Sequence, residues 1–145
     1  MKSVKSIGHV AIRVKDIDRS LDFYVRKLGF PEMFRLYRDD NALWIVYLRV
    51  TDEQFIELFP DAVGDRAPAA EMIGLNHLCL EVGDIDAALA DLAEANVPLF
   101  RPKKVGADHN YQAWIEDPDG NRIELMQLGK DAMQAAAIRR LRGAA

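Results

Sequence analysis

The chain has 145 residues, of which 50% are hydrophobic and 29% are charged, enough for one compact unit or two small fused ones. A net charge of −4 without a clustered basic face argues against nucleic-acid binding. No apolar run approaches the roughly 18 residues of a membrane span, and no signal-peptide pattern is found at the N-terminus. Because its single cysteine, Cys79, cannot form an intramolecular disulfide, we expect a cytoplasmic protein without a membrane partner.

The first half of the chain predicts a strand, a helix and three further strands. Between residues 7 and 14 apolar and polar side chains alternate, which is typical of a half-buried strand and places His9 and Arg13 on one face. Asp16 or Asp18 can cap the helix that follows. We expect this helix to end near Leu28, and the later strands to span 32–38, 42–50 and 54–59.

The second half predicts the same order of elements. The segment from Pro60 to Gly74 is rich in Asp, Ala, Gly and Pro, which indicates a linker. Later, Asp117-Pro118-Asp119-Gly120 predicts a hairpin turn that places Glu124 in the last strand. The expected elements are a strand at 75–82, a helix at 85–94, strands near 98–102, at 111–116 and at 121–127, and a helix at 130–142. The apolar face of the last helix is expected to pack against the core or a groove, with a lid or a dimer contact as alternatives.

The two halves are also similar in sequence. Gly8-His9-Val10-Ala11-Ile12 recurs as Asn76-His77-Leu78-Cys79-Leu80, and Phe55-Ile56-Glu57-Leu58 recurs as Arg122-Ile123-Glu124-Leu125. Each half thus supplies one His and one Glu. A lone His or Glu on a strand is usually structural, but a buried, unpaired carboxylate is costly, so the doubled pair in partly apolar surroundings favours a cation. If a pseudo-twofold axis relates the halves, both pairs can meet at one divalent ion.

These features resemble the vicinal oxygen chelate superfamily, and within it most closely glyoxalase I, the lactoylglutathione lyases. The resemblance rests on the paired βαβββ modules, the His near the start of each first strand and the Ile-Glu-Leu in each last strand, and it covers about residues 5–128. It implies an α+β fold in which module 1 (5–62) and module 2 (74–128) form an incomplete barrel, the glyoxalase/bleomycin resistance/dioxygenase fold. A C-terminal helix (130–142) completes the single domain, and the resemblance implies a homodimer.

The positions that match the family's metal ligands are His9, Glu57, His77 and Glu124. Methylmalonyl-CoA epimerases typically have Gln at the position of Glu57, and extradiol dioxygenases do not need this ligand, so the four-residue set favours the glyoxalase pattern. Nitrogen and carboxylate ligands without thiolate suit Ni, Co, Zn, Mn or Fe(II).

The resemblance implies a metal-dependent lyase or isomerase that acts on a small α-hydroxy or α-oxo carbonyl compound through an enediolate, with glutathione as a candidate co-substrate. Glu124 is then the expected base, and Glu57 can serve the opposite face. Arg13, four residues after His9, matches the Arg that binds a substrate carboxylate. Two alternatives stay open: an Fe(II) extradiol-type dioxygenase, and a metal-free small-molecule-binding protein of the bleomycin-resistance kind.

Several further residues bear on these expectations. Asp61 stands where glyoxalases commonly use Asn, and it would repel a substrate carboxylate. The Lys103-Lys104 pair could compensate, although an exposed loop pair is the simpler expectation. Cys79 is expected to be a small buried hydrophobe, and no role is assigned to Tyr47.

Overall fold

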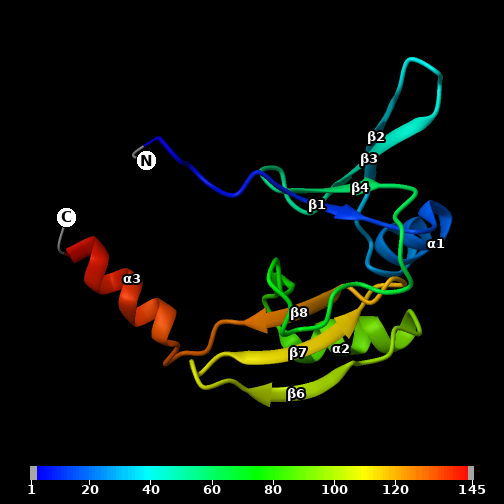
Figure 1. Cartoon of the computed structure of the whole chain (residues 1–145). Coiled ribbons are helices and arrows are strands. Elements are labelled where there is room, and N and C mark those ends of the chain that lie inside the picture. Colours follow the sequence, from blue (N-terminus) through cyan, green and yellow to red (C-terminus); the bar gives the residue numbers. More distant parts are fainter. Residues whose placement is uncertain (1–2, 144–145) are drawn as a thin grey trace. The chain divides into compact units, whose positions relative to one another are not determined.

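The computed structural model describes residues 3–143, which form two compact units that divide between Ala67 and Pro68. Each unit contains one open four-stranded sheet (Figure 1). The strand order in unit 1 is β1 (His9–Arg13), β4 (Phe55–Phe59), β3 (Leu43–Arg49) and β2 (Glu32–Tyr37), and in unit 2 it is β5 (Leu78–Glu81), β8 (Arg122–Gln127), β7 (Tyr111–Glu116) and β6 (Arg101–Val105). In each sheet the first strand runs parallel to the last, and the other pairs are antiparallel. The predicted α+β class and the two βαβββ modules are confirmed.

Unit 1 follows the predicted order of elements closely. The Asp16 carboxylate accepts hydrogen bonds from the backbone N–H groups of Asp18 and Arg19, so it is Asp16 that caps the first helix. Gly29 has a φ of 75°, which a glycine adopts without strain where the helix ends. The elements are β1 (His9–Arg13), α1 (Ile17–Leu21), η1 (Asp22–Lys27), β2 (Glu32–Tyr37), β3 (Leu43–Arg49) and β4 (Phe55–Phe59).

The predicted first helix changes its winding halfway along. After α1 the chain continues as the π-helical segment η1, which the regular helical spacing of the sequence does not predict. The neighbouring aromatic residues Phe23 and Tyr24 are both buried and meet edge to face, with ring centroids 5.0 Å apart. The wider turn accommodates two consecutive side chains on the core side of the helix.

The register of the first sheet defines its two faces. Val46, Ile56 and Leu58 are almost fully buried and lie on the face that packs on the core. On the other face, Ala11 of β1 and Tyr47 of β3 are the direct neighbours of Glu57 in β4. Glu57 therefore sits in the middle of the sheet, flanked by a strand on each side.

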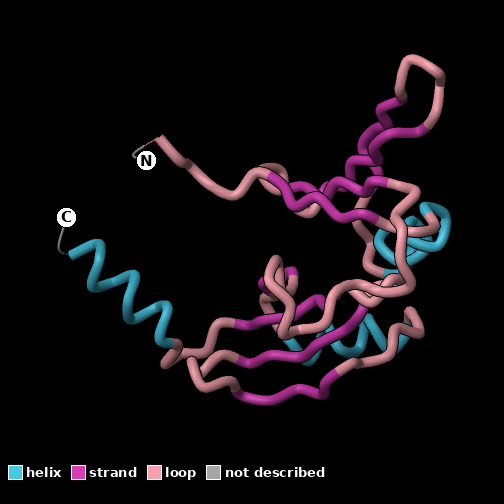
Figure 2. Tube along the Cα trace, viewed as in Figure 1, coloured by secondary structure: helices cyan, strands magenta, loops and turns pink. Residues whose placement is uncertain are grey.

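Unit 2 repeats this arrangement (Figure 2), with two differences from the predicted elements. The first strand begins at Leu78 instead of Leu75, because the guanidinium of Arg122 donates two hydrogen bonds, of 3.0 and 2.7 Å, to the carbonyl oxygen of Asn76. The second strand of this unit lies about three residues later than predicted. The elements are β5 (Leu78–Glu81), α2 (Ile85–Glu94), β6 (Arg101–Val105), β7 (Tyr111–Glu116), β8 (Arg122–Gln127) and α3 (Met133–Gly143).

The shift of β6 has a simple cause. The apolar residues Leu99 and Phe100 favour a strand in the sequence, yet both side chains are exposed and precede the strand. The strand that forms, β6, contains Pro102, which an edge strand tolerates because the missing N–H can face solvent. Lys103 and Lys104 thus lie on a strand, and the expectation of a loop pair was wrong.

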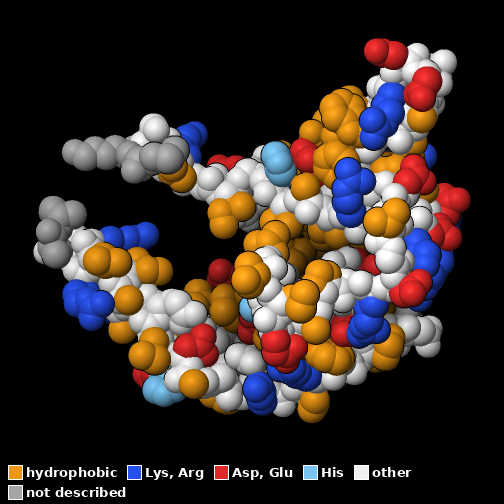
Figure 3. Space-filling view, viewed as in Figure 1, with side chains coloured by type: hydrophobic (Ala, Val, Ile, Leu, Met, Phe, Trp, Pro, Cys, Tyr) orange, Lys and Arg blue, Asp and Glu red, His pale blue; other side chains and the backbone are white. Residues whose placement is uncertain are grey.

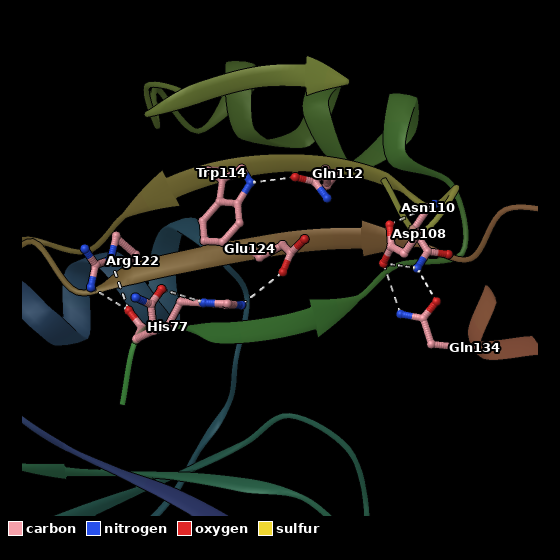
Figure 4. Close-up of polar contacts among 9 residues, drawn as sticks. His77, Asp108, Asn110, Gln112, Trp114, Arg122, Glu124 and Gln134 are labelled. Atoms are coloured by element: carbon pink, nitrogen blue, oxygen red, sulfur yellow. Dashed lines mark hydrogen bonds and ion pairs between the residues drawn. The ribbon is translucent and has the colours of Figure 1, made fainter. Parts of the chain in front are cut away.

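The C-terminal helix is tied to unit 2 by a buried amide. The Asn110 side chain is fully buried and donates hydrogen bonds of 2.8 Å to Asp108 and to Gln134 of α3, while it accepts one from the backbone N–H of Gly129 (Figure 4). Gln134 also donates to Asp108. This network fixes the first turn of α3 to the β6–β7 connection.

The rest of α3 does not pack as expected. No side chain of this helix is buried, and hydrophobic side chains are visible on its surface (Figure 3). Met133, Ile138 and Leu141 are all exposed, so the predicted packing against core or groove was wrong for the part of the chain that the structure describes. Among residues 3–143, no helix is long and apolar enough to cross a membrane.

We expect Gly129→Ala to destabilise the protein. A Cβ at this position would clash with the backbone carbonyl of His109, which cannot move without disturbing the Asn110 network, so the cost should be about 1–3 kcal/mol. Gly83→Ala, in the same unit and with no atom within 4 Å of the added Cβ, is the matched control. Urea unfolding measures both, and equal midpoints for the two variants would contradict the predicted clash.

Candidate functional site

In unit 1 the sheet brings the predicted His and Glu together. His9 is the first residue of β1, and its Nδ1 lies 3.6 Å from Oε1 of Glu57 in the middle of β4. The His9 side chain is half exposed, whereas Glu57 is buried with a residual exposure of 5%. The parallel pairing of β1 with β4 produces this contact, since it places the start of one strand beside the other. An imidazole and a buried carboxylate thus meet on one face of the sheet.

Unit 2 contains the equivalent pair. Nε2 of His77 lies 3.1 Å from Oε2 of Glu124, and Nδ1 of His77 contacts Oδ1 of Asn76 at 3.0 Å (Figure 4). The His77 ring also meets the ring of Trp114 edge-on, with centroids 4.7 Å apart. His77 precedes β5 instead of lying within it, which corrects the predicted strand boundary. Its position is fixed by the Asn76 and Trp114 contacts.

The four predicted ligands therefore occur as two pairs, one in each unit. Among the described residues, no group of three or more His, Cys, Asp or Glu side chains is arranged as a metal centre. Each pair still offers one nitrogen and one carboxylate donor, and this chemistry suits a divalent transition metal. Glu57 supports the fit, because a buried carboxylate needs a positive charge or hydrogen-bond donors. The predicted four-ligand site stays a prediction.

Tyr47 is a neighbour of the candidate site that the sequence did not reveal. It lies directly opposite Glu57 in the β3–β4 pairing. A hydrogen bond to the Glu57 carboxylate raises the pKa of the Tyr47 hydroxyl, and burial and the carboxylate charge raise it further. The ring of Phe34 stacks on the Tyr47 ring with centroids 4.4 Å apart. Alternation along β3 would have placed Tyr47 on one face, but only the register identifies its partner.

Cys79 is the corresponding neighbour of Glu124. It lies opposite Glu124 in the parallel β5–β8 pairing. The residue as a whole is exposed, so the expectation of a buried hydrophobe was wrong. Partial removal of the thiol from water raises the pKa of Cys79 to about 12, and the nearby Glu124 carboxylate contributes to this rise. Cys79 is therefore a protonated thiol at neutral pH.

The candidate substrate-binding residues have different environments. Arg13 is exposed on the same face as His9, with its guanidinium 5.7 Å from the centroid of the Phe59 ring. Lys103, by contrast, is bound to both carboxylate oxygens of Asp86 at 2.6 Å. Lys103 is thus paired within unit 2, whereas the Arg13 guanidinium lies exposed beside the Phe59 ring.

The similarity to known proteins agrees with this geometry. A family model described as Glyoxalase/Bleomycin resistance protein/Dioxygenase superfamily matches residues 6–125. The uncharacterised protein YwkD of Bacillus subtilis (strain 168) is 38% identical over 129 residues, covering 86% of this chain and 98% of YwkD. A lactoylglutathione lyase of Pseudomonas putida is 32% identical over 149 residues, covering 83% of each chain.

Solved structures give the same result. The crystal structure of a glyoxalase family protein from Enterococcus faecalis superposes with a TM-score of 0.74 and 31% identity, and the match covers 84% of this chain and 97% of that one. The fold, the repeated modules and the family model are thus in agreement. The chain belongs to the glyoxalase/bleomycin resistance protein/dioxygenase superfamily.

Proposed function

We propose that this protein is a metal-dependent lyase or isomerase of the glyoxalase I type, acting on a small α-hydroxy or α-oxo carbonyl compound. The observation that supports it most is the repeated contact of a His with a largely buried Glu, His9 with Glu57 and His77 with Glu124. The similarity to a lactoylglutathione lyase favours the same reaction class. A metal-free binding protein would have no use for two such pairs.

In this proposal the two pairs together bind one divalent ion of Ni, Co, Zn, Mn or Fe(II). The ion would polarise the substrate carbonyl and acidify the adjacent C–H bond. A carboxylate oxygen of Glu124 takes the proton from this carbon and returns it to the neighbouring carbon. Glu57 has the matching position in unit 1 and can accept or donate a proton on the opposite face. A hemithioacetal of glutathione and a 2-oxoaldehyde is the first substrate to test.

Arg13 supports an anionic substrate. Arg13 lies on the same face of β1 as His9, and its guanidinium lies near the Phe59 ring. It can therefore donate hydrogen bonds to a substrate carboxylate on that face. Asp61, just beyond β4, has a φ of 61° and places a negative charge close to the end of that strand. In this proposal Arg13 supplies the positive charge that an anionic substrate needs beside Asp61.

An Fe(II) extradiol-type dioxygenase is the second candidate. It requires only three protein ligands, whereas this chain provides two His–Glu pairs. Oxygen uptake in the presence of catechols distinguishes it from the lyase. Uptake by the Fe(II)-loaded protein, without isomerisation of the hemithioacetal, would favour the dioxygenase.

The first test of the proposal is metal binding. Protein purified without chelators should contain about one equivalent of divalent metal per site, and one metal of the series should restore isomerisation of the hemithioacetal to apoprotein. His77→Ala and Glu124→Gln should each abolish tight binding, because each removes one of four protein ligands. Glu94→Gln, at the end of α2, is the control. Unchanged stoichiometry and affinity in both ligand variants would refute the site.

A second test separates proton transfer from substrate selection. Glu124→Asp keeps a carboxylate but withdraws it by about one methylene. The variant should therefore lose activity mainly through kcat, which should fall about 10²-fold. Arg13→Met removes the hydrogen-bond donor but keeps much of the apolar stem. The variant should therefore show a raised KM, and only for anionic substrates. Equal losses for neutral and anionic substrates with Arg13→Met, at intact metal content, would show that Arg13 does not select the substrate.

A third test asks whether the ligands come from one chain or two. We expect a homodimer in which each metal takes His9 and Glu57 from one chain and His77 and Glu124 from the other. Mixing inactive His9→Ala with inactive His77→Ala chains should then restore up to one good site per heterodimer after subunit exchange. Sites contained within single chains would give no recovery, because each chain would keep its own defect.

A further inference from the structure

The C-terminal helix α3 carries an apolar face that is exposed in the structure of residues 3–143. Met133, Ile138 and Leu141 are 59%, 46% and 66% exposed. Met133, Ala137 and Leu141 follow one another at intervals of four residues, so their side chains form one stripe along the helix, with Ile138 beside it. The helix is fixed at its first turn by the hydrogen bond between Asn110 and Gln134. An exposed apolar stripe on an anchored helix indicates an interaction surface.

The exposed apolar surface continues onto the end of the sheet from which α3 leaves (Figure 1). Tyr111 is the first residue of β7, and its partners in the register are Val105 at the end of β6 and Gln127 at the end of β8. Val105 and Tyr111 are exposed, and so is Leu128, which follows β8 on the way to α3. We call the following residues the α3 surface: Val105, Tyr111, Leu128, Met133, Ile138 and Leu141.

The helix α3 lies outside the part of the chain that the family model matches. That match ends at residue 125, whereas α3 begins at Met133. The match to YwkD likewise takes in 98% of YwkD but 86% of this chain. The role of α3 is therefore additional to those of the two shared modules, and it has to be inferred from the residues of the helix.

The two ends of α3 carry charges of opposite sign. Near its start lie Asp131 and Asp108, against one basic residue, Lys130. Residues 133–143 contain no acidic side chain, and three arginines lie in the last two turns: Arg139, Arg140 and Arg142. Two parallel copies of α3 would bring like charges together. Two antiparallel copies would place the arginines of each helix beside the acidic start of the other, so the charges favour an antiparallel pair.

The apolar stripe has the symmetry that an antiparallel pair requires. Ala137 lies midway between Met133 and Leu141. A twofold axis beside Ala137 therefore places Met133 of each copy opposite Leu141 of the other. The small side chain of Ala137 allows the two helices to approach to about 8 Å where they cross. The same surface thus fits itself, as a twofold contact between identical chains demands.

We propose that α3 binds α3 of a second copy of this chain, in antiparallel orientation about a twofold axis beside Ala137. A second copy is the occupant because the surface complements itself in both apolar pattern and charge. Three helical turns alone bury less than the roughly 1,200 Å² of a stable interface, so the exposed Val105, Tyr111 and Leu128 add to the contact. The inference goes beyond the proposed function and does not depend on the metal site.

The first test is self-association of the full chain, measured by sedimentation over a dilution series. Leu141→Glu should raise the dissociation constant of the largest assembly about 10²-fold or more, because each pair then buries two carboxylates in its apolar stripe. Ala136→Glu adds the same charge to an exposed position of α3 outside the stripe, and it is the matched control. A wild-type protein that stays monomeric, or equal constants for wild type and Leu141→Glu, would overturn the proposal.

Disulfide cross-linking tests the orientation of the pair. In a Cys79→Ala background, Ala137→Cys should form a cross-linked dimer on mild oxidation, because only a residue beside the axis meets its own copy. Met133→Cys alone should stay uncrosslinked, whereas a mixture of Met133→Cys and Leu141→Cys chains should cross-link. Efficient cross-linking of Met133→Cys with itself would indicate a parallel pair and contradict the antiparallel arrangement.

The same variants distinguish a different occupant of the α3 surface. Vesicles that contain anionic lipid provide the comparison, since an apolar stripe next to arginines can also bind a membrane surface. If the wild-type protein binds these vesicles, Leu141→Glu does not, and Ala137→Cys gives no cross-link, the surface binds lipid and the proposal is wrong. Cross-linking of Ala137→Cys without vesicle binding supports the pair.

Discussion

The largely buried carboxylate in the last strand of each unit, Glu57 or Glu124, is the constraint on which the rest of the site depends. Glu57 and Glu124 occupy central strands between two neighbours, where an ionised group loses most of its water. The sheet compensates each one with the imidazole that precedes or begins the parallel neighbouring strand, His9 or His77. Parallel pairing of the first and last strands is therefore what makes a His–Glu pair possible at all.

Much of this arrangement could be predicted because it depends on patterns among residues that are close together in the sequence. The helix α2 and the strand β7 occur at the predicted residues, since helical spacing with an Asp84 cap and strand alternation before a Pro-Gly turn are local patterns. The repeat likewise identified both His–Glu pairs. The predicted boundaries of β5 and β6 were wrong. The backbone carbonyl of Asn76 accepts a hydrogen bond from the Arg122 side chain instead of from a neighbouring strand, and β6 contains Pro102, which an edge strand tolerates.

The roles of Tyr47 and Cys79 could not be predicted in the same way. Alternation assigns a residue to a face, but its neighbour on the next strand depends on register, and a shift of one residue would turn Tyr47 to the opposite face. The register follows from the length of turns and from bulges such as the one in the β2–β3 pairing. These are collective properties of the folded sheet, so no short motif records that Tyr47 meets Glu57.

The repeat also shows where two similar modules have acquired different chemistry. The His–Glu pair is the same in both, but the residues around it differ: Tyr47 corresponds to Trp114, Ala11 to Cys79 and Arg13 to Glu81. A donor to the carboxylate in one unit is replaced by a ring against the imidazole in the other. The superfamily fold thus defines which side chains can meet, whereas the neighbours of each carboxylate differ between the two units.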